Sequence, residues 1–475
     1  SHGMNTEVDE KLLPLRYAKN TYNYDFNNGA LKTGLGISDA YLSHNVNDPT
    51  LKKLLDYPEG LDILGVWVFK EYNNYLGQYN NIFIAYMSDK RLYMNFLYAP
   101  SVMLVPISSM SFNTCPTLIN YKVNGSDSVL VSTFDEGLYI WNNTGPAIKV
   151  KNAPVMTSMC IHYERLFATG SLDKRNLWFS DDMNPTNWNL SLTEGGFISM
   201  VDEKGTLNKV VSFDDYLYVF REFGIARVTA FANQQEFSVS QLFTSSNRIY
   251  ANTIAVCGDR VMFLASDGIY TFNGITTTKL SLGIENLINV NLNKEAVGAY
   301  YDGCYYLACT MSFPDDEKVG CEEEGNYKNN TLLEINLKTW TINILRGVDI
   351  YNLQTITDPV ENSLLVCVKD EGRVKLGKVD KSGKVFSKPT KKVWRSPSVD
   401  FDMPTRKKLI KEILVITKSD ITVEIDADGK KKQMLVKGKK GAQRLFPNVT
   451  GYSVGINFIR EEVEISNPQV IVGAL

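Results

Sequence analysis

The sequence predicts an all-β protein: a β-propeller of seven blades, alternatively six, followed by a C-terminal antiparallel β-sandwich module. The first observation is a repeated hairpin pattern of apolar run, turn with Gly and second apolar run, since Gly tolerates the positive φ of tight turns. The clearest copy is VMFLASDGIYTFNG at 261–274, and similar copies begin at 129, 216 and 364. The second observation is spacing, because units of several strands repeating about every 40 to 45 residues are typical of propeller blades.

The third observation is composition. The chain has 475 residues, of which 44% are hydrophobic and 11% aromatic, enough for one large core or two smaller ones. No apolar run approaches the roughly 18 residues that a membrane-spanning helix needs, so no membrane segment is expected. The net charge of −3 gives no overall attraction to nucleic acid or acidic membranes, although a local patch could still provide one.

Residues 1–56 are interpreted as a tag remnant, Ser1 to Gly3, and an extended arm. The arm contains RYAKNTYNYDFNNGALKTGLGI at 16–37, which is rich in Asn, Gly and aromatic residues. In propellers a terminal strand often completes a blade that is made mostly by the other end of the chain. We therefore expect the arm to be able to close the ring.

Residues 57–385 are assigned to the propeller. Their apolar runs group into seven units, of which the last, from IYNLQTITD to RVKLGKV, is one strand short. Seven blades result if the arm supplies that strand, and six if the first or last unit is not a true blade. The sixth unit is interrupted by an acidic, hydrophilic insertion from Ser312 to Asn330, which we expect to be a mobile surface loop.

Residues 386–475 are assigned to a basic β-sandwich module. A segment with three prolines leads into alternating strands, and Asp428-Gly429 marks a hairpin. Between Lys388 and Arg444 there are sixteen Lys or Arg and seven Asp or Glu. One hypothesis is contact with DNA or an acidic partner, and the other is that the lysines only protect edge strands. The candidate contact residues are Lys430, Lys431, Lys432, Lys437, Lys439 and Lys440.

Catalytic, cofactor-binding and metal-binding residues are not expected, and the chain is interpreted as a non-enzyme. None of the seven cysteines forms a C-x-x-C pair, and Cys304 and Cys309 should face opposite sides of a strand. Beyond the tag there are two histidines, His44 and His162, so a zinc or Ser-His-Asp site is hard to build. A partial Asp-box, Ser171 to Trp178, has Arg175 in place of its Gly and is interpreted as a structural turn.

Three phrases resemble a family: NTYNYDFNNGALKTGLGI in the arm, RLFATGSLDKRNLWFSDDMNPTNW in a blade, and KKVWRSPSVDFDMPTRKKLIKEILV at the linker. They are similar to the tail β-propeller proteins of bacteriophages, in particular the packaged-DNA stabilization (tail accessory or nozzle) proteins of short-tailed phages. The resemblance implies a structural virion component below the portal that helps retain packaged DNA, assembled in the bacterial cytoplasm. It implies contacts with portal, adaptor and distal tail proteins, and a homo-oligomer that we expect to be a hexamer in the virion and a monomer in isolation.

The alternative is a carbohydrate-binding or receptor-binding propeller. That function would need exposed Trp and Tyr side chains lining a pocket at one end of the propeller. The tryptophans at 67, 141, 178 and 340 lie within strand patterns and are expected in the core instead.

Overall fold

The fold is taken from a computed structural model of the chain. The structure describes residues 4–14, 17–27, 30–40, 58, 60–96, 103–231, 233–289, 291–357, 362–417, 419–439, 441–460 and 469–473. Helices in these ranges are short. They are the 3-10 helices Glu10–Leu12, Gln234–Glu236, Ala251–Thr253, Glu285–Leu287 and Asn293–Glu295, and the α-helix α1 (Cys321–Glu324). None of the described helices is long and apolar enough to span a membrane.

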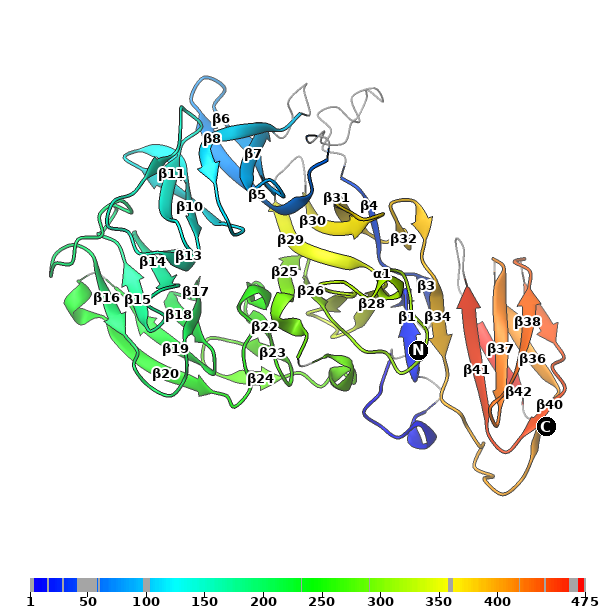
Figure 1. The fold of residues 1–475 in the computed structure, drawn as a ribbon. Helices are drawn as coiled ribbons and strands as arrows, with labels where there is room; N and C mark the ends of the chain where they lie inside the picture. The colour runs from blue at the N-terminus through cyan, green and yellow to red at the C-terminus, as the bar shows by residue number, and fades with distance from the viewer. Residues whose placement is uncertain are drawn as a thin grey trace.

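Six consecutive four-stranded antiparallel sheets follow one another along the chain and form blades one to six (Figure 1). Blades one to three comprise β5 (Ile63–Asn73), β6 (Gln78–Met87), β7 (Arg91–Phe96), β8 (Val105–Ser111); β9 (Thr117–Val123), β10 (Ser126–Thr133), β11 (Gly137–Trp141), β12 (Ile148–Lys149); β13 (Met156–His162), β14 (Arg165–Gly170), β15 (Asn176–Phe179) and β16 (Gly196–Ser199). Blades four to six comprise β17 (Leu207–Phe213), β18 (Tyr216–Arg221), β19 (Gly224–Thr229), β20 (Ser238–Thr244); β21 (Ala255–Val256), β22 (Val261–Ala265), β23 (Gly268–Phe272), β24 (Thr277–Lys279); β25 (Val297–Tyr301), β26 (Cys304–Cys309), β27 (Thr331–Asn336) and β28 (Ile342–Arg346).

The seventh blade combines both ends of the propeller sequence. It contains β29 (Asp349–Thr357), β30 (Asn362–Asp370), β31 (Arg373–Asp380) and, from the arm, β4 (Gly36–Asp39). β4 pairs antiparallel with β31, placing Ile37 opposite Val379. Two short strands, β32 (Lys384–Val385) and β33 (Lys388–Pro389), extend the sheet beyond β4. The propeller therefore has seven blades within the described residues.

Each pair of neighbouring blades shares an apolar core. Phe69 of blade one packs with Trp141 of blade two, and equivalent clusters follow around the ring. The ring is closed by a cluster that joins Ile63 and Phe83 of blade one to Leu365 of blade seven. Because every blade buries both of its faces in this way, the ring is one continuous packed body.

The hairpin of β22 and β23 is the middle pair of strands in blade five, as its sequence predicts. Gly268, at the turn, has φ of +148°, a conformation that L side chains rarely adopt. Asp267 accepts a hydrogen bond from the Tyr270 hydroxyl at 2.8 Å, and its carboxylate lies 3.4 Å from Lys279 Nζ. It serves the turn.

The C-terminal module is a sandwich, as predicted. Its strands are β34 (Lys392–Arg395), β35 (Lys408–Ile410), β36 (Glu412–Ile416), β37 (Ile421–Ala427), β38 (Lys430–Val436), β39 (Ala442–Leu445), β40 (Val449–Gly451), β41 (Val454–Arg460) and β42 (Gln469–Gly473). One sheet has the order β1-β34-β41-β37-β38 and the other β39-β36-β42, beside the β35-β40 pair. Alternate residues such as Ile413, Val423 and Phe458 form the core between them.

The arm contributes to both bodies. Its first strand, β1 (Asn20–Tyr22), is an edge strand of the sandwich and pairs with β34. The hairpin of β2 (Tyr24–Asn27) and β3 (Ala30–Thr33) follows, and Tyr24 and Leu31 enter the sandwich core. β4 then enters the propeller. The arm, blue in Figure 1, thus runs between the propeller and the sandwich.

Candidate functional site

A group of buried charged side chains meets at the end of β28. The guanidinium of Arg346 donates to Glu322 from Nε (3.0 Å to Oε1) and Nη2 (2.8 Å to Oε2). Nη1 donates to Asp315 Oδ1 at 2.8 Å, and Nη2 to the carbonyl of Glu317 at 2.6 Å. Burial alone would lower the pKa of Arg346, but the bonds to Glu322 and Asp315 outweigh it and raise the pKa. We call these four residues, together with Arg395, the Arg346 junction.

The insertion supplies the acids of this junction. Many of its residues from Ser312 to Asn330 are exposed, as expected of a surface segment, but two of its acids are held inside the fold. The side chains of Asp315 and Glu322 are buried. Glu322 lies on α1 and also accepts the backbone N–H of Val319 at 3.1 Å. A hydrophilic composition predicted solvent exposure of these carboxylates, but their ion pairs with a buried cation on β28 offset the desolvation cost of burying them.

The arm covers the guanidinium. The guanidinium of Arg346 makes cation–π contacts with the rings of Tyr22 of β1 and Phe313 of the insertion, whose centres lie 4.7 and 4.2 Å from the guanidinium carbon. Asn23, with φ of +63°, accepts the backbone N–H of Arg346 at 2.8 Å and donates to the carbonyl of Lys391 at 2.7 Å. One arm residue therefore binds both blade six and the linker.

The linker to the sandwich binds the same acids. Lys391 Nζ lies 2.8 Å from Glu317 Oε2, and Arg395 Nη2 lies 2.9 Å from Glu317 Oε1. Burial alone would raise the pKa of Glu317, but these two cations outweigh it and lower the pKa. Asn20 of β1 donates to Asp315 at 2.6 Å. The junction thus joins four segments: the insertion, blade six, the arm and the linker.

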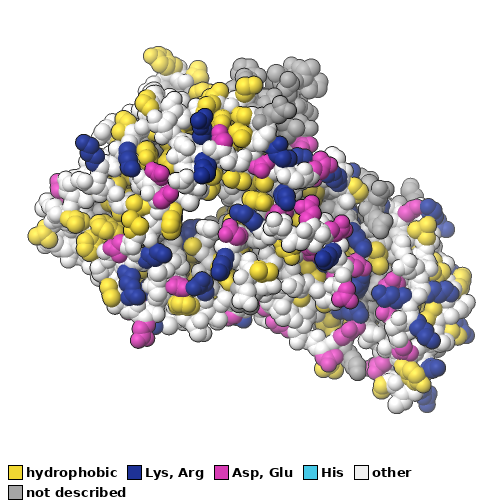
Figure 2. Space-filling model, viewed as in Figure 1, with side chains coloured by type: hydrophobic (Ala, Val, Ile, Leu, Met, Phe, Trp, Pro, Cys, Tyr) yellow, Lys and Arg dark blue, Asp and Glu magenta, His cyan; other side chains and the backbone are white. Residues whose placement is uncertain are grey.

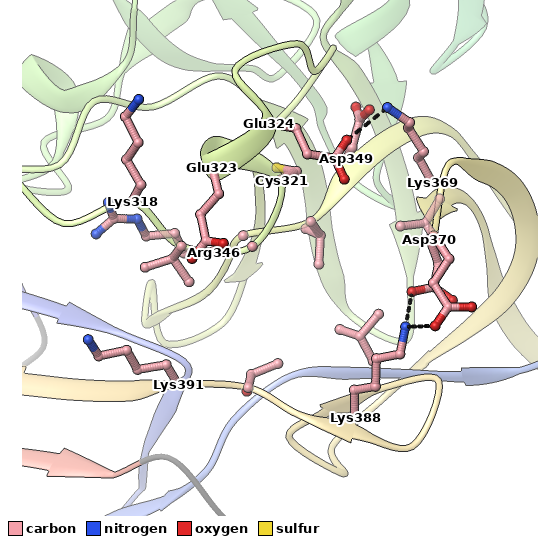
Figure 3. A pocket seen from close by; sticks show the side chains of 18 of the residues that line it. Lys318, Cys321, Glu323, Glu324, Arg346, Asp349, Lys369, Asp370, Lys388 and Lys391 are labelled. Atoms are coloured by element: carbon pink, nitrogen blue, oxygen red, sulfur yellow. Dashed lines mark hydrogen bonds and ion pairs between the residues drawn. The ribbon is translucent and has the colours of Figure 1, made fainter.

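A cavity of about 610 Å³ lies beside the junction, between the insertion, blade seven and the linker. Figure 3 shows ion pairs on its wall: Lys369 to Glu324 at 3.1 Å, and Lys388 to Asp370 at 2.7 Å. Lys388 also binds Glu371 at 2.8 Å. These lysines are neutralised by acids of the same wall, so the cavity does not present them as a free anion site.

The cavity does not assemble a set of catalytic groups. Asp349 is buried on its wall, accepts the backbone N–H of Lys328 at 2.8 Å, and has a pKa raised by burial. Burial also raises the pKa of the neighbouring Cys321 thiol, so the thiolate needed for nucleophilic attack is disfavoured. Among the described residues there is no group of three or more His, Cys, Asp or Glu that could hold a metal ion.

A Ser-His pair that the sequence did not predict lies between blades three and four. His162 Nδ1 is 2.8 Å from Ser212 Oγ, and burial lowers the pKa of the imidazole. His162 Nε2 is buried and makes no hydrogen bond to any described residue. A catalytic triad needs an acid on that second nitrogen, so the pair acts as a link between blades.

The predicted lysines lie on or after the edge strand β38. Lys431 lies 3.5 Å from Glu424, Lys432 donates to the carbonyl of Pro447 at 2.6 Å, and Lys437 lies 2.6 Å from Asp420. Lys430 and Lys439 are exposed, and Lys440 lies outside the described residues.

The cysteines and tryptophans have mainly packing roles. Cys304 and Cys309 enter different core clusters, as their odd spacing predicts. Trp141 is buried, and Trp67 and Trp340 pack partly buried against apolar clusters, as does the tryptophan at 178.

No protein-family model and no curated protein matches the sequence. Among solved structures, BBS1N in complex with ARL6DN is similar at a TM-score of 0.43 and 11% identity, covering 67% of this chain and 92% of that chain. An ancestral GH74 enzyme is similar at a TM-score of 0.41 and 10% identity, covering 66% of this chain and 48% of that one. The chain thus spans about half the length of that enzyme. Both are β-propellers, and the likeness concerns the fold alone.

Proposed function

We propose that the chain is a non-enzymatic structural component of a bacteriophage tail, part of the tube or nozzle below the portal, where it helps retain packaged DNA. The Arg346 junction is the observation that carries this proposal. Its insertion, arm and linker join the propeller to the sandwich through buried charges and shared sheets. A rigidly joined propeller and sandwich suit a tail tube that must keep its shape against the pressure of the packaged genome.

The resemblance of the arm, blade and linker phrases to packaged-DNA stabilization proteins supports the same assignment. Under this assignment, the chain is a homo-oligomer, a hexamer in the virion and a monomer in isolation. It binds portal or adaptor proteins on one side and distal tail proteins on the other. It resides in the virion tail after assembly in the bacterial cytoplasm, and needs no cofactor.

Deletion of the gene from the phage or prophage that encodes the chain tests the proposal. We expect particles that package DNA but lose it, measured as a drop in DNase-protected DNA, and rescue by a plasmid copy. Mass spectrometry of purified wild-type particles should find the chain in the tail. Absence from particles, or full DNA retention without it, would contradict the proposal.

A glycan array with the purified chain separates the proposal from the carbohydrate-binding alternative. The tryptophans at 67, 141, 178 and 340 are buried or partly buried, and the exposed Tyr72, Tyr75 and Tyr79 lie on the β5–β6 hairpin and do not line the cavity beside the junction, which favours the structural function. We expect no glycan binding. Specific binding of one glycan class would favour the alternative.

A further inference from the structure

We infer that the cavity beside the Arg346 junction binds a primary alkylamine, whose ammonium group pairs with the carboxylate of Asp349. Free diamines and the lysine side chain of another protein share this chemistry. The cavity has a volume of about 610 Å³, a size at which pockets hold small molecules. The inference goes beyond the proposed function and does not depend on it.

The buried carboxylate of Asp349 has an oxygen without a partner. Asp349 is the first residue of β29, lines the cavity and is only 1% exposed. Its Oδ1 accepts the backbone N–H of Lys328 at 2.8 Å, but its Oδ2 makes no hydrogen bond to any described residue. Because an unpaired buried carboxylate oxygen costs free energy, a cation supplied by a ligand stabilises this group.

The electrostatics of Asp349 agree with a missing cation. Burial raises the pKa of its carboxyl group, and the backbone bonds and the charges of Lys369 and Lys328, which lower the pKa, do not cancel that rise. Neither amine is free for Asp349. Lys369 lies 3.1 Å from Glu324, and Lys328 lies 3.4 Å from Glu295. A ligand ammonium at Oδ2 supplies the charge that these lysines do not.

The single unpaired oxygen favours an ammonium group over other cations. A guanidinium binds best to both oxygens of a carboxylate, but Oδ1 of Asp349 is already occupied. A divalent metal ion needs several oxygen ligands, and no group of three His, Cys, Asp or Glu that could hold one occurs in the described ranges. An ammonium is a compact charge that one carboxylate oxygen can bind.

The apolar part of the wall fits the hydrocarbon chain of such an amine. Val319, Val348, Val368 and Pro389 line the cavity together with Asp349. Contact of methylene groups with these side chains removes apolar surface from water and so adds to binding. The site therefore favours an alkylamine over ammonia.

The attraction for an amine is local to the cavity. The net charge of the chain is −3, and Figure 2 shows Lys and Arg side chains interspersed with Asp and Glu over the face that it draws. That face presents no large acidic field that would gather amines. Binding thus depends on the carboxylates of the cavity wall.

Glu323 offers a second carboxylate, for the other end of a diamine. It lies on α1, is exposed and lines the same cavity, and no described residue pairs with its side chain. The exposed amine of Lys318 lies well apart from Asp349 in Figure 3, so it does not fill the place assigned to the ligand. Two carboxylates on one partly apolar wall favour a molecule with two ammonium groups.

Isothermal titration calorimetry of the full chain tests the site with two amines, 1,4-diaminobutane and an end-blocked glycine peptide with one central lysine. About 150 mM salt screens exposed charges beyond about 8 Å. We expect saturable binding, tighter for the diamine if the natural source is a free amine and tighter for the peptide if it is a protein lysine. The uncharged 1,4-butanediol should bind roughly tenfold more weakly or not at all. Binding of neither amine, or equal binding of the diol, would overturn the inference.

Substitutions locate the bound amine. Asp349→Asn keeps an oxygen for the N–H of Lys328 but removes the charge, and should weaken diamine binding by roughly tenfold or more. Glu323→Gln, at an exposed position, should weaken it by a smaller factor. Asp302→Asn, an exposed acid of blade six outside the cavity lining, is the charge control and should leave the affinity unchanged.

An unchanged affinity of Asp349→Asn, or equal losses in all three variants, would overturn the inference. Circular dichroism of each variant checks that it folds. If Asp349→Asn does not fold, Glu323→Gln decides, and an unchanged diamine affinity of that variant would overturn the inference.

Discussion

Arg346 and Glu322 form a buried bidentate ion pair between blade six and the insertion, with 2.8 Å between Nη2 and Oε2. The two residues are 24 positions apart, and Tyr22 of the arm strand β1 covers the guanidinium. Two further carboxylates, Asp315 and Glu317, and two further cations, Lys391 and Arg395, surround the pair, and Arg346 is the cation that both Glu322 and Asp315 bind at 2.8 Å.

Arg346→Met should lower the free energy of unfolding by about 3 to 5 kcal/mol, because it leaves the carboxylates of Glu322 and Asp315 buried without their cation. Arg248→Met is the control. Arg248 pairs with Glu222 but its side chain is 50% exposed, and exposed pairs contribute about 0 to 1 kcal/mol. Urea unfolding of both variants measures the difference, and equal losses would contradict a stabilising junction.

Gly377→Ala should destabilise the seventh blade by about 1 to 3 kcal/mol through overpacking. A Cβ at Gly377 would lie 2.4 Å from Ile37 Cγ2 and 3.0 Å from the carbonyl of Ser38, both on β4. Gly455→Ala is the matched strand control, because its Cβ would meet nothing closer than 3.8 Å. Faster amide exchange of β4 in the Gly377 variant would localise the effect. Unchanged exchange there would show that the arm strand does not depend on this contact.

Lys392→Met should alter the pH dependence of stability in alkaline solution. Burial, with Arg460 and Lys384 nearby, lowers the pKa of Lys392 from 10.5 to about 8. Between pH 8 and 10.5 the unfolded chain therefore binds more protons than the folded chain, and stability rises with pH. The wild type should gain stability relative to the variant across this window, measured by urea unfolding. Lys209, also lowered to about 8, is present in both proteins and cancels. Parallel profiles would contradict the prediction.

The basic module gives a prediction about DNA. Lys430→Gln with Lys439→Gln removes two exposed cations with no side-chain partner among the described residues, and should reduce the salt dependence of binding by about one unit of slope per lost phosphate contact. Lys437→Gln, whose amine binds Asp420, is the control and should have a smaller effect. Fluorescence anisotropy with duplex DNA at several salt concentrations measures the slopes. No binding at low salt would end the DNA hypothesis.

The strand pattern predicted most of the fold because the features that specify hairpins and blades are local in sequence. Alternation and Gly-containing turns such as Asp267-Gly268 specify hairpins, and their regular spacing specifies blades. The missing strand of the last blade could be assigned to the arm because a closed ring leaves one unpaired edge on β31. The blade count became definite only with the pairing of Ile37 and Val379.

The junction could not be predicted in the same way. Arg346 ends an ordinary strand, INILR, and nothing local distinguishes it from a surface arginine. Its acids lie in a stretch whose composition indicates exposure, and Tyr22 is more than 300 positions away. The one available signal is the excess of acidic residues in a hydrophilic insertion within a repeat. That signal does not identify the buried cation that binds them.

The arm strand β4 also dictates an order of events during synthesis. Ile37 must wait for Val379, about 340 residues later in the chain, before it has a partner. At about 5 to 20 residues per second, that delay is on the order of 20 to 70 s. During this time six blades can form beside an unpaired strand and an open seventh edge, the kind of surface on which chains aggregate. The first strands to leave the ribosome are thus among the last to fold. Aggregation of nascent chains that still lack the seventh blade is therefore the main risk during production of this protein.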